Sequence, residues 1–147
     1  KEHDDPLYEE EVVEIFLSPG PDRRHYVELE FSPRNVVFDA WVHNPTGDRA
    51  SMDVDVAWHA VGLHSAARVS GTLENRHDRD IGWIVEVALP WSALGRSGPP
   101  APGARWPMNL YRIERGEVEE FSSWSPLGVA PPDFHRPDRF GEIEFLD

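Results

Sequence analysis

The sequence contains no cysteine. This absence excludes a disulfide framework, a metal site built from thiolates and a thiol nucleophile. It leaves the redox compartment of the protein open, because a secreted protein can also lack cysteine.

Basic residues are scarce, since 14 lysines and arginines stand against 27 aspartates and glutamates. The resulting net charge of -13 would repel a nucleic-acid backbone and an anionic membrane surface. We therefore expect a neutral or cationic partner and no nucleic acid.

Long apolar runs are missing as well, and none approaches the roughly 18 residues of a membrane span. The first ten residues, KEHDDPLYEE, have neither the basic nor the apolar region of a signal peptide. We expect no membrane insertion, and we expect any leader to lie outside this chain.

What the sequence does contain is enough apolar and aromatic material for the core of one domain, with 39% hydrophobic residues in a chain of 147. Apolar residues recur mostly with period two between turn residues, which predicts an all-β antiparallel sandwich. A single short helical turn is expected at 91–95, and a proline-rich surface loop at 125–139. The expected strands are 11–17, 24–31, 35–43, 52–61, 66–73, 81–90, 105–115, 116–124 and 140–146.

The first of these strands carries a carboxylate, Glu14, on the same face as Val12 and Phe16. A buried carboxylate without a partner is costly. Glu14 is therefore expected to pair with an arginine such as Arg112, to bind a metal, or to lie at the floor of a solvated groove and accept hydrogen bonds from the hydroxyls of a ligand.

The next strand, 24–31, alternates in the same way and is expected to pair with the first. We interpret its alternation as one inward face and one solvent face. The inward face holds Val27, Leu29 and Phe31, and the outward face holds Tyr26, Glu28 and Glu30.

Several segments together resemble the family 9 carbohydrate-binding modules over nearly the whole chain. These segments are VVEIFLSP (12–19), GWIVEVALPWSALG (82–95), PGARWPMNLYRIER (102–115), and WSP followed by FHRPDRFGEIEF (134–145). The resemblance implies a jelly-roll-like β-sandwich related to the DOMON domains. It also implies secretion to the extracellular space or periplasm, and a non-catalytic module of a larger multidomain protein, such as a glycoside hydrolase acting on xylan or cellulose. The family pattern has further strands before VEIF, so the single domain 1–147 is expected to be incomplete at its N-terminal side.

The resemblance also implies a ligand site. Glu14 matches the glutamate that accepts sugar hydroxyls, and Tyr8 stands where the family has a tryptophan that forms one wall of the site. Trp124 matches the opposite wall. Asn109, Arg112 and Trp41 are further candidates, each with a structural alternative: a solvated strand face for Asn109, an ion pair for Arg112 and the core for Trp41. Tyr8 could likewise cover the core, and we assign the other tryptophans to the core.

Other functions find less support. No residues form a recognisable catalytic motif, so we expect no enzyme and no catalytic residues. His59 and His64 have no zinc spacing, and His135 is expected to hold its loop by a hydrogen bond. Family members often carry calcium, so a structural calcium at aspartate-containing turns is possible, although solvated turns are favoured.

Two alternatives keep the fold but change the function. One is a structural or interaction module that has lost its site, which the replacement of tryptophan by Tyr8 favours. The other is a b-type haem protein with Met108 and a histidine as ligands, because related sandwiches bind haem between their sheets.

Overall fold

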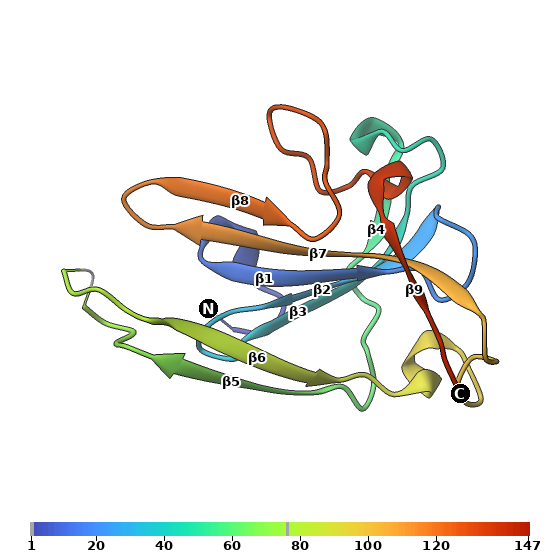
Figure 1. The fold of residues 1–147 in the computed structure, drawn as a ribbon, viewed down its shortest axis with the longest axis horizontal. Coiled ribbons are helices and arrows are strands. Elements are labelled where there is room, and N and C mark those ends of the chain that lie inside the picture. The colour runs from blue at the N-terminus through green and yellow to red at the C-terminus, as the bar shows by residue number, and fades with distance from the viewer. Residues whose placement is uncertain (1, 76) are drawn as a thin grey trace.

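The computed structural model describes residues 2–75 and 77–147. Within these ranges the strands form two antiparallel sheets, and the helical elements are single 3-10 turns (Figure 1). The larger sheet has the order β4 (Asp53–Asp55), β3 (Val37–His43), β2 (His25–Phe31), β1 (Val12–Leu17), β7 (Arg105–Arg115) and β8 (Glu119–Ser123), with β9 (Gly141–Glu144) also paired to β7.

The second sheet is a two-stranded ribbon of β5 (His64–Ser70) and β6 (Gly82–Ala88), which covers one face of the larger sheet (Figure 1). Apolar side chains fill the space between the two layers. This inter-sheet core contains Leu17, Val27, Leu29, Phe31, Ala60, Leu94 and Trp106, with Trp41, Trp58 and Trp91 packed against it. The prediction of an all-β sandwich is therefore confirmed.

The opposite face of the larger sheet is covered by turns and by the segment that precedes β9, instead of a sheet (Figure 1). The second core forms there. It contains Leu7, Val12, Phe16, Tyr26, Val42, Tyr111, Ile113, Leu127, Phe134 and Phe140. Hydrogen bonds hold the covering segment, because the hydroxyl of Tyr111 donates to the Phe134 carbonyl at 2.9 Å and the amide of Asn44 donates to the His135 carbonyl at 3.2 Å.

The register of β1 and β2 places three glutamates under this cover. Glu14 lies directly opposite Glu30 across the antiparallel pair, and Glu28 is on the same face of β2. The prediction that Tyr26, Glu28 and Glu30 point to solvent is wrong, because all three side chains are buried. Alternation assigned them to the correct common face, but that face is covered.

The helical turn expected at 91–95 is present, and the structure has three further 3-10 turns among its described residues. The turn η3 (Trp91–Leu94) ends at Gly95 in the left-handed region, with φ of 69°, as a C-terminal glycine permits. The turns η1 (Leu7–Glu9), η2 (Arg49–Ser51) and η4 (Pro137–Arg139) were not expected. The predicted strand 52–61 is wrong beyond residue 55, because the Asp55 carboxylate accepts a hydrogen bond from the Ala57 amide and turns the chain.

Candidate functional site

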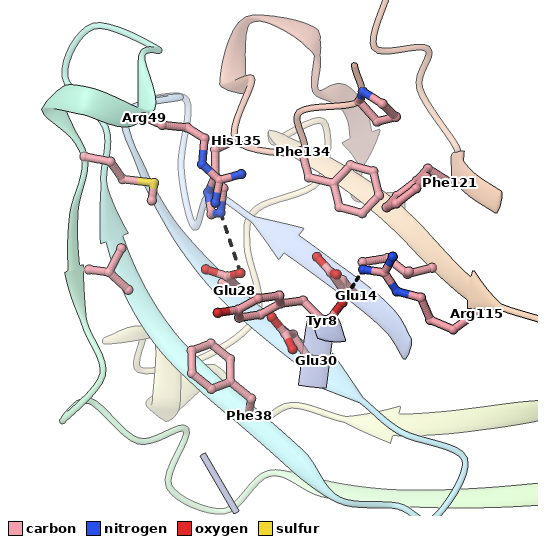
Figure 2. Close-up of a pocket in the computed structure, with 14 residues that line it drawn as sticks. Tyr8, Glu14, Glu28, Glu30, Phe38, Arg49, Arg115, Phe121, Phe134 and His135 are labelled. Atoms are coloured by element: carbon pink, nitrogen blue, oxygen red, sulfur yellow. Dashed lines mark hydrogen bonds and ion pairs between the residues drawn. The ribbon is translucent and has the colours of Figure 1, made fainter. Parts of the chain in front are cut away.

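A cavity of about 310 Å³ opens on the face of the larger sheet that carries the three glutamates (Figure 2). Strands β1, β2, β3 and β7 supply its floor, and η1, η2 and the segment before β9 supply its walls. Its lining consists of Tyr8, Glu14, Glu28, Glu30, Phe38, Arg49, Met52, Val54, Ile113, Arg115, Phe121, Pro132, Phe134 and His135.

The three carboxylates lie close together in this cavity. One oxygen from each of Glu14, Glu28 and Glu30 falls within 4.8 Å of the others, and the three side chains are between 1% and 7% exposed. Oε1 of Glu14 and Oε2 of Glu30 have no hydrogen-bond partner. An unpaired carboxylate at such a depth needs a proton or a ligand, because its ionised form is poorly solvated.

Burial is the main cause of the altered acidity of these groups. It raises the pKa of Glu14 well above its usual range, and the charges of Glu30 and Glu28 raise it further. Burial and the charge of Glu30 raise the pKa of Glu28 to about 8, against a smaller opposing effect of Arg49. Burial likewise raises the pKa of Glu30. The carboxyl groups therefore retain protons near neutral pH.

Arg112 does not pair with Glu14. It lies on the opposite face of the sheet, beside Val13, where its guanidinium is 3.5 Å from Glu11 and also pairs with Glu114. Arg112 thus forms ion pairs, which was the structural alternative given for it. Oε1 of Glu14, a residue of the cavity lining, has no hydrogen-bond partner.

Aromatic rings flank the carboxylates. The ring of Tyr8 is 52% exposed, and Nη2 of Arg115 donates to the Tyr8 carbonyl at 3.0 Å, which fixes η1 at the cavity (Figure 2). Phe121 of β8 is 38% exposed. Phe134 is buried and stacked on Tyr111 with the ring centroids 4.2 Å apart. These rings give the cavity accessible apolar surfaces beside its acidic floor.

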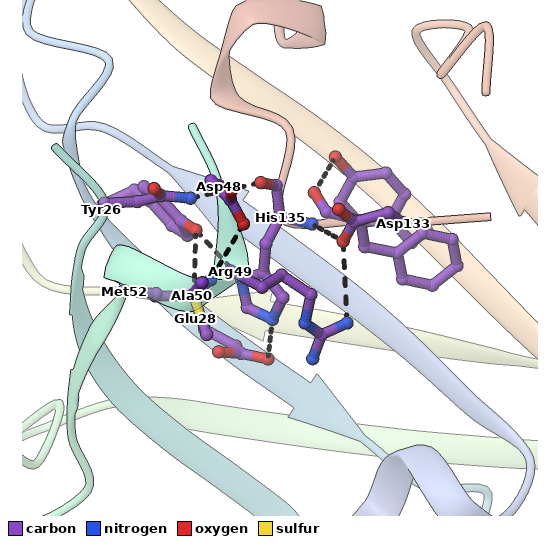
Figure 3. A network of polar contacts seen from close by, with 11 residues as sticks. Tyr26, Glu28, Asp48, Arg49, Ala50, Met52, Asp133 and His135 are labelled. Atoms are coloured by element: carbon purple, nitrogen blue, oxygen red, sulfur yellow. Dashed lines mark hydrogen bonds and ion pairs between the residues drawn. The ribbon is translucent and has the colours of Figure 1, made fainter. Parts of the chain in front are cut away.

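His135 connects the cavity wall to β2 (Figure 3). Its Nδ1 is 2.9 Å from the Tyr26 hydroxyl, which confirms the predicted structural hydrogen bond, and its Nε2 is 3.8 Å from Glu28. Burial, followed by the charge of Arg49, lowers the pKa of His135 to about 3. The imidazole is therefore neutral at physiological pH and brings no positive charge to Glu28.

The structure does not bring every predicted ligand residue to this cavity. Trp124 is 52% exposed and follows β8, and its ring lies against Gly141 of β9, where an added Cβ would approach the ring to 2.6 Å. Asn109 is fully buried, and its carboxamide donates to the Ser125 carbonyl at 3.0 Å and accepts from the Ser125 amide at 2.8 Å. Trp41 packs against the inter-sheet core.

Of the residues that line the cavity, sequence reasoning assigned only Tyr8 and Glu14 to a ligand site. Glu28 and Glu30 were assigned to solvent, and Phe121 and Phe134 were not singled out. The pairing of 11–17 with 24–31 carried the signal for the glutamates, because antiparallel neighbours on one face bring Glu14 next to them. No pattern in the sequence indicated which loop would cover that face.

A second group of possible metal ligands lies on the opposite face of β3, because its member Asp39 follows directly after Phe38 of the cavity lining. His3, Asp4, Asp39 and His59 each place one ligand atom within 4.8 Å of the others, whereas His64 is not among them. Asp39 is already engaged, since its Oδ2 accepts from the Ala60 amide at 2.7 Å and its Oδ1 is 3.3 Å from His59. Structural calcium therefore stays a prediction.

Comparison with known proteins identifies the family. The family description "Carbohydrate-binding family 9" matches residues 1–145. The chain belongs to carbohydrate-binding family 9. Two motifs of the family resemblance, VVEIFLSP and FHRPDRFGEIEF, supply Glu14 and Phe134 to one cavity.

Two known proteins are similar to this family 9 chain over nearly its whole length, and both are longer than it is. An extracellular protein of Arthroderma benhamiae is 29% identical over 148 residues, covering 97% of this chain and 64% of the relative. A solved structure from Bacteroides uniformis, of a proposed carbohydrate-binding protein, matches with a TM-score of 0.75 at 22% identity and covers 98% of this chain and 65% of the other. The chain thus spans somewhat less than two thirds of both relatives. No helix among the described residues is long and apolar enough to cross a membrane.

Proposed function

We propose that this protein binds a saccharide non-catalytically in the cavity above β1 and β2, with Tyr8 as a stacking surface and Glu14 as a hydroxyl acceptor. The observation that carries the proposal is that the exposed ring of Tyr8 and the unpartnered oxygen of Glu14 line the same cavity in a family 9 chain.

The chemistry of a pyranose suits such a lining. A pyranose ring presents axial C–H groups on its faces, which pack on aromatic rings, and hydroxyls at its edge, which donate to carboxylates. Taking about 1 kcal/mol for each aromatic surface and each net hydrogen bond, and subtracting association costs, we expect a binding free energy of about -4 to -8 kcal/mol. This range corresponds to millimolar to micromolar affinity, which is sufficient to hold a larger protein near a polymer.

The placement of the carboxylates argues against hydrolysis. A glycosidase places two carboxyl groups on opposite sides of the scissile bond, with one as acid and the other as nucleophile or base. Here the three carboxylates project from one face of two neighbouring strands. In this arrangement they can accept hydrogen bonds from one edge of a ligand, but they do not lie on opposite sides of a glycosidic bond.

The wider setting follows from the same proposal. The relative from Arthroderma benhamiae is described as extracellular, and both relatives are longer than this chain. We infer that the protein acts outside the cell as part of a larger molecule, with fragments of cellulose or xylan as the first ligands to test.

Calorimetric titration with cellotriose and xylotriose tests the proposal, alongside Tyr8→Ala and Glu14→Gln. We expect saturable binding that weakens about tenfold in each variant. Trp124→Ala is measured in parallel. If Trp124 forms a wall of the site, as the family resemblance predicts, its removal should weaken binding to a similar extent. If its position outside the cavity lining keeps it from the ligand, the affinity should not change. Repeating the titration with a calcium chelator tests structural calcium.

If a folded preparation bound none of the saccharides, including the amino sugar tested below, the site-less structural module would be favoured. The haem alternative has its own measurement, because haem bound by Met108 would give the purified protein a Soret band. Met108 packs against the inter-sheet core.

A further inference from the structure

The carboxylate cluster exceeds what a neutral sugar requires. One acceptor at the edge of the ligand would suffice, yet Glu14, Glu28 and Glu30 converge within 4.8 Å and repel one another when ionised. Oε1 of Glu14 and Oε2 of Glu30 are buried and have no hydrogen-bond partner, and both residues line the cavity. A cation placed among the three carboxyl groups would favour their ionised forms and displace the protons that they retain in the free protein, so the cluster suits a positively charged ligand group.

The basic side chains of the lining form no close ion pair with the cluster, although the charge of Arg49 acts to lower the pKa of Glu14 and of Glu28. Among residues 2–75 and 77–147, no arginine forms an ion pair with any of the three glutamates. The two arginines of the lining are engaged elsewhere: Arg49 is 3.5 Å from Asp133, and Arg115 pairs with Glu119 and donates to the Tyr8 carbonyl. His135 is buried and contributes only a 3.8 Å approach to Glu28.

The walls favour an organic cation over a metal ion. Calcium prefers six to eight oxygen ligands, whereas the walls above the carboxylates consist mainly of apolar side chains, such as Phe38, Val54 and Phe121, together with Arg49, Arg115 and His135. A primary ammonium group has three N–H donors, which matches three carboxylates. The rings beside it can accept the apolar faces of the sugar that carries the ammonium group.

We propose that the saccharide recognised by this cavity is an amino sugar with a free primary amine. Its ammonium group lies among Glu14, Glu28 and Glu30, and its ring packs against Tyr8 and Phe121. This inference rests on the proposed function and specifies the ligand class of the same site.

Three trimers with the same β-1,4-linked backbone isolate the C2 substituent. Cellotriose carries a hydroxyl at C2, the glucosamine trimer carries an ammonium group, and the N-acetylglucosamine trimer carries a neutral amide. Titration at pH 6.5 and about 0.15 M salt screens distant surface charges while leaving the amine largely protonated. We expect the glucosamine trimer to bind about tenfold or more tightly than cellotriose, and the acetylated trimer to bind more weakly than the glucosamine trimer.

Charge-removing variants locate the preference. Glu30→Gln and Glu14→Gln should each reduce the preference for the glucosamine trimer about fivefold or more, since each removes one charge-assisted hydrogen bond. Glu86→Gln removes an equal charge from an exposed position of β6, outside the cavity, and should leave the preference unchanged. Thermal melting of each variant establishes that it is folded.

The outcomes separate this inference from the proposed function. If cellotriose binds as tightly as the glucosamine trimer, saccharide binding stands and the amino-sugar inference is overturned. A preference that persists in both cavity variants would also overturn it, because the attraction would then come from the overall charge of the protein. Saturable binding of calcium alone that Glu30→Gln abolishes, without a preference for the amine, would assign the carboxylates to a metal. If no trimer binds, both proposals fail.

Discussion

Glu28 and Glu30 give the proposed binding cavity its acidic floor, and their burial also costs the folded protein stability. Their side chains are almost completely buried beside Glu14, and ionisation of any of them places charge in a poorly solvated space. A protein that needed only a packed core would gain stability from apolar residues at these positions.

The raised pKa values of the glutamates predict a dependence of stability on pH. Burial raises the pKa of Glu30 to about 7 and that of Glu28 to about 8, whereas the unfolded chain releases these protons near pH 4.3. The folded state therefore binds more protons than the unfolded state in this range, and the free energy of unfolding falls as the pH rises. His135 acts in the opposite sense below about pH 6.5, because its folded pKa is lowered to about 3.

Between about pH 6.5 and pH 8 only the glutamates contribute, and we expect a loss of about 1–2 kcal/mol in the free energy of unfolding. Urea denaturation at a series of pH values measures this loss. The double variant Glu28→Gln/Glu30→Gln should reduce it, and Glu86→Gln should not. A stability that stays constant in the unmodified protein over this range would contradict the assigned protonation.

At the scale of elements, the strand pair β1 and β2 shows which structural features the sequence predicts and which it does not. Its alternation predicted both strands within about one residue and divided their side chains correctly between two faces. It could not show that the second face is covered, because the cover comes from the segment before β9, about a hundred residues later in the chain. That contact depends on tertiary hydrogen bonds such as Tyr111 to Phe134, which leave no periodic signal.

The sequence was also misleading after β4. Residues 52–61 continue the apolar alternation of a strand, but the carboxylate of Asp55 forms a local turn, and Trp58 enters the inter-sheet core. Among the site residues, Tyr8 and Glu14 were placed together, whereas Trp124 lies against β9. Its role in binding stays a prediction that Trp124→Ala tests.

The hydroxyl of Tyr111 should contribute to the stability of the loop that covers the cavity. In Tyr111→Phe the ring stacking on Phe134 remains, but the buried Phe134 carbonyl loses its donor. We expect the free energy of unfolding to fall by about 1–2 kcal/mol. We also expect amide exchange to accelerate in 125–139, because the loop would open more often. Tyr8→Phe serves as the matched control for stability, since the Tyr8 side chain is half exposed. Equal stability of the two variants would show that other contacts hold the loop.

At the scale of the whole molecule, the two faces of the larger sheet differ in what covers them. The ribbon of β5 and β6 closes one face with an apolar core, which supplies rigidity (Figure 1). Turns and a long segment cover the other face and leave a cavity. Binding residues are commonly carried by loops on a rigid scaffold. Here the sheet positions the carboxylates and Phe121, while η1 and the segment before β9 supply Tyr8 and Phe134.

The net charge of -13 adds an effect that extends beyond the cavity. A negative surface attracts a cationic saccharide before contact, and salt screens this attraction, because the Debye length falls from about 10 Å at 0.1 M to about 3 Å at 1 M. If the ligand is an amino sugar, its affinity should fall severalfold as sodium chloride is raised from about 0.05 M to 0.5 M, while the affinity for cellotriose stays nearly constant. Titration of both trimers at each salt concentration measures the difference. Parallel salt responses for the two trimers would mean that the sugar amine makes no electrostatic contribution, and the three glutamates would then serve as acceptors for neutral hydroxyls alone.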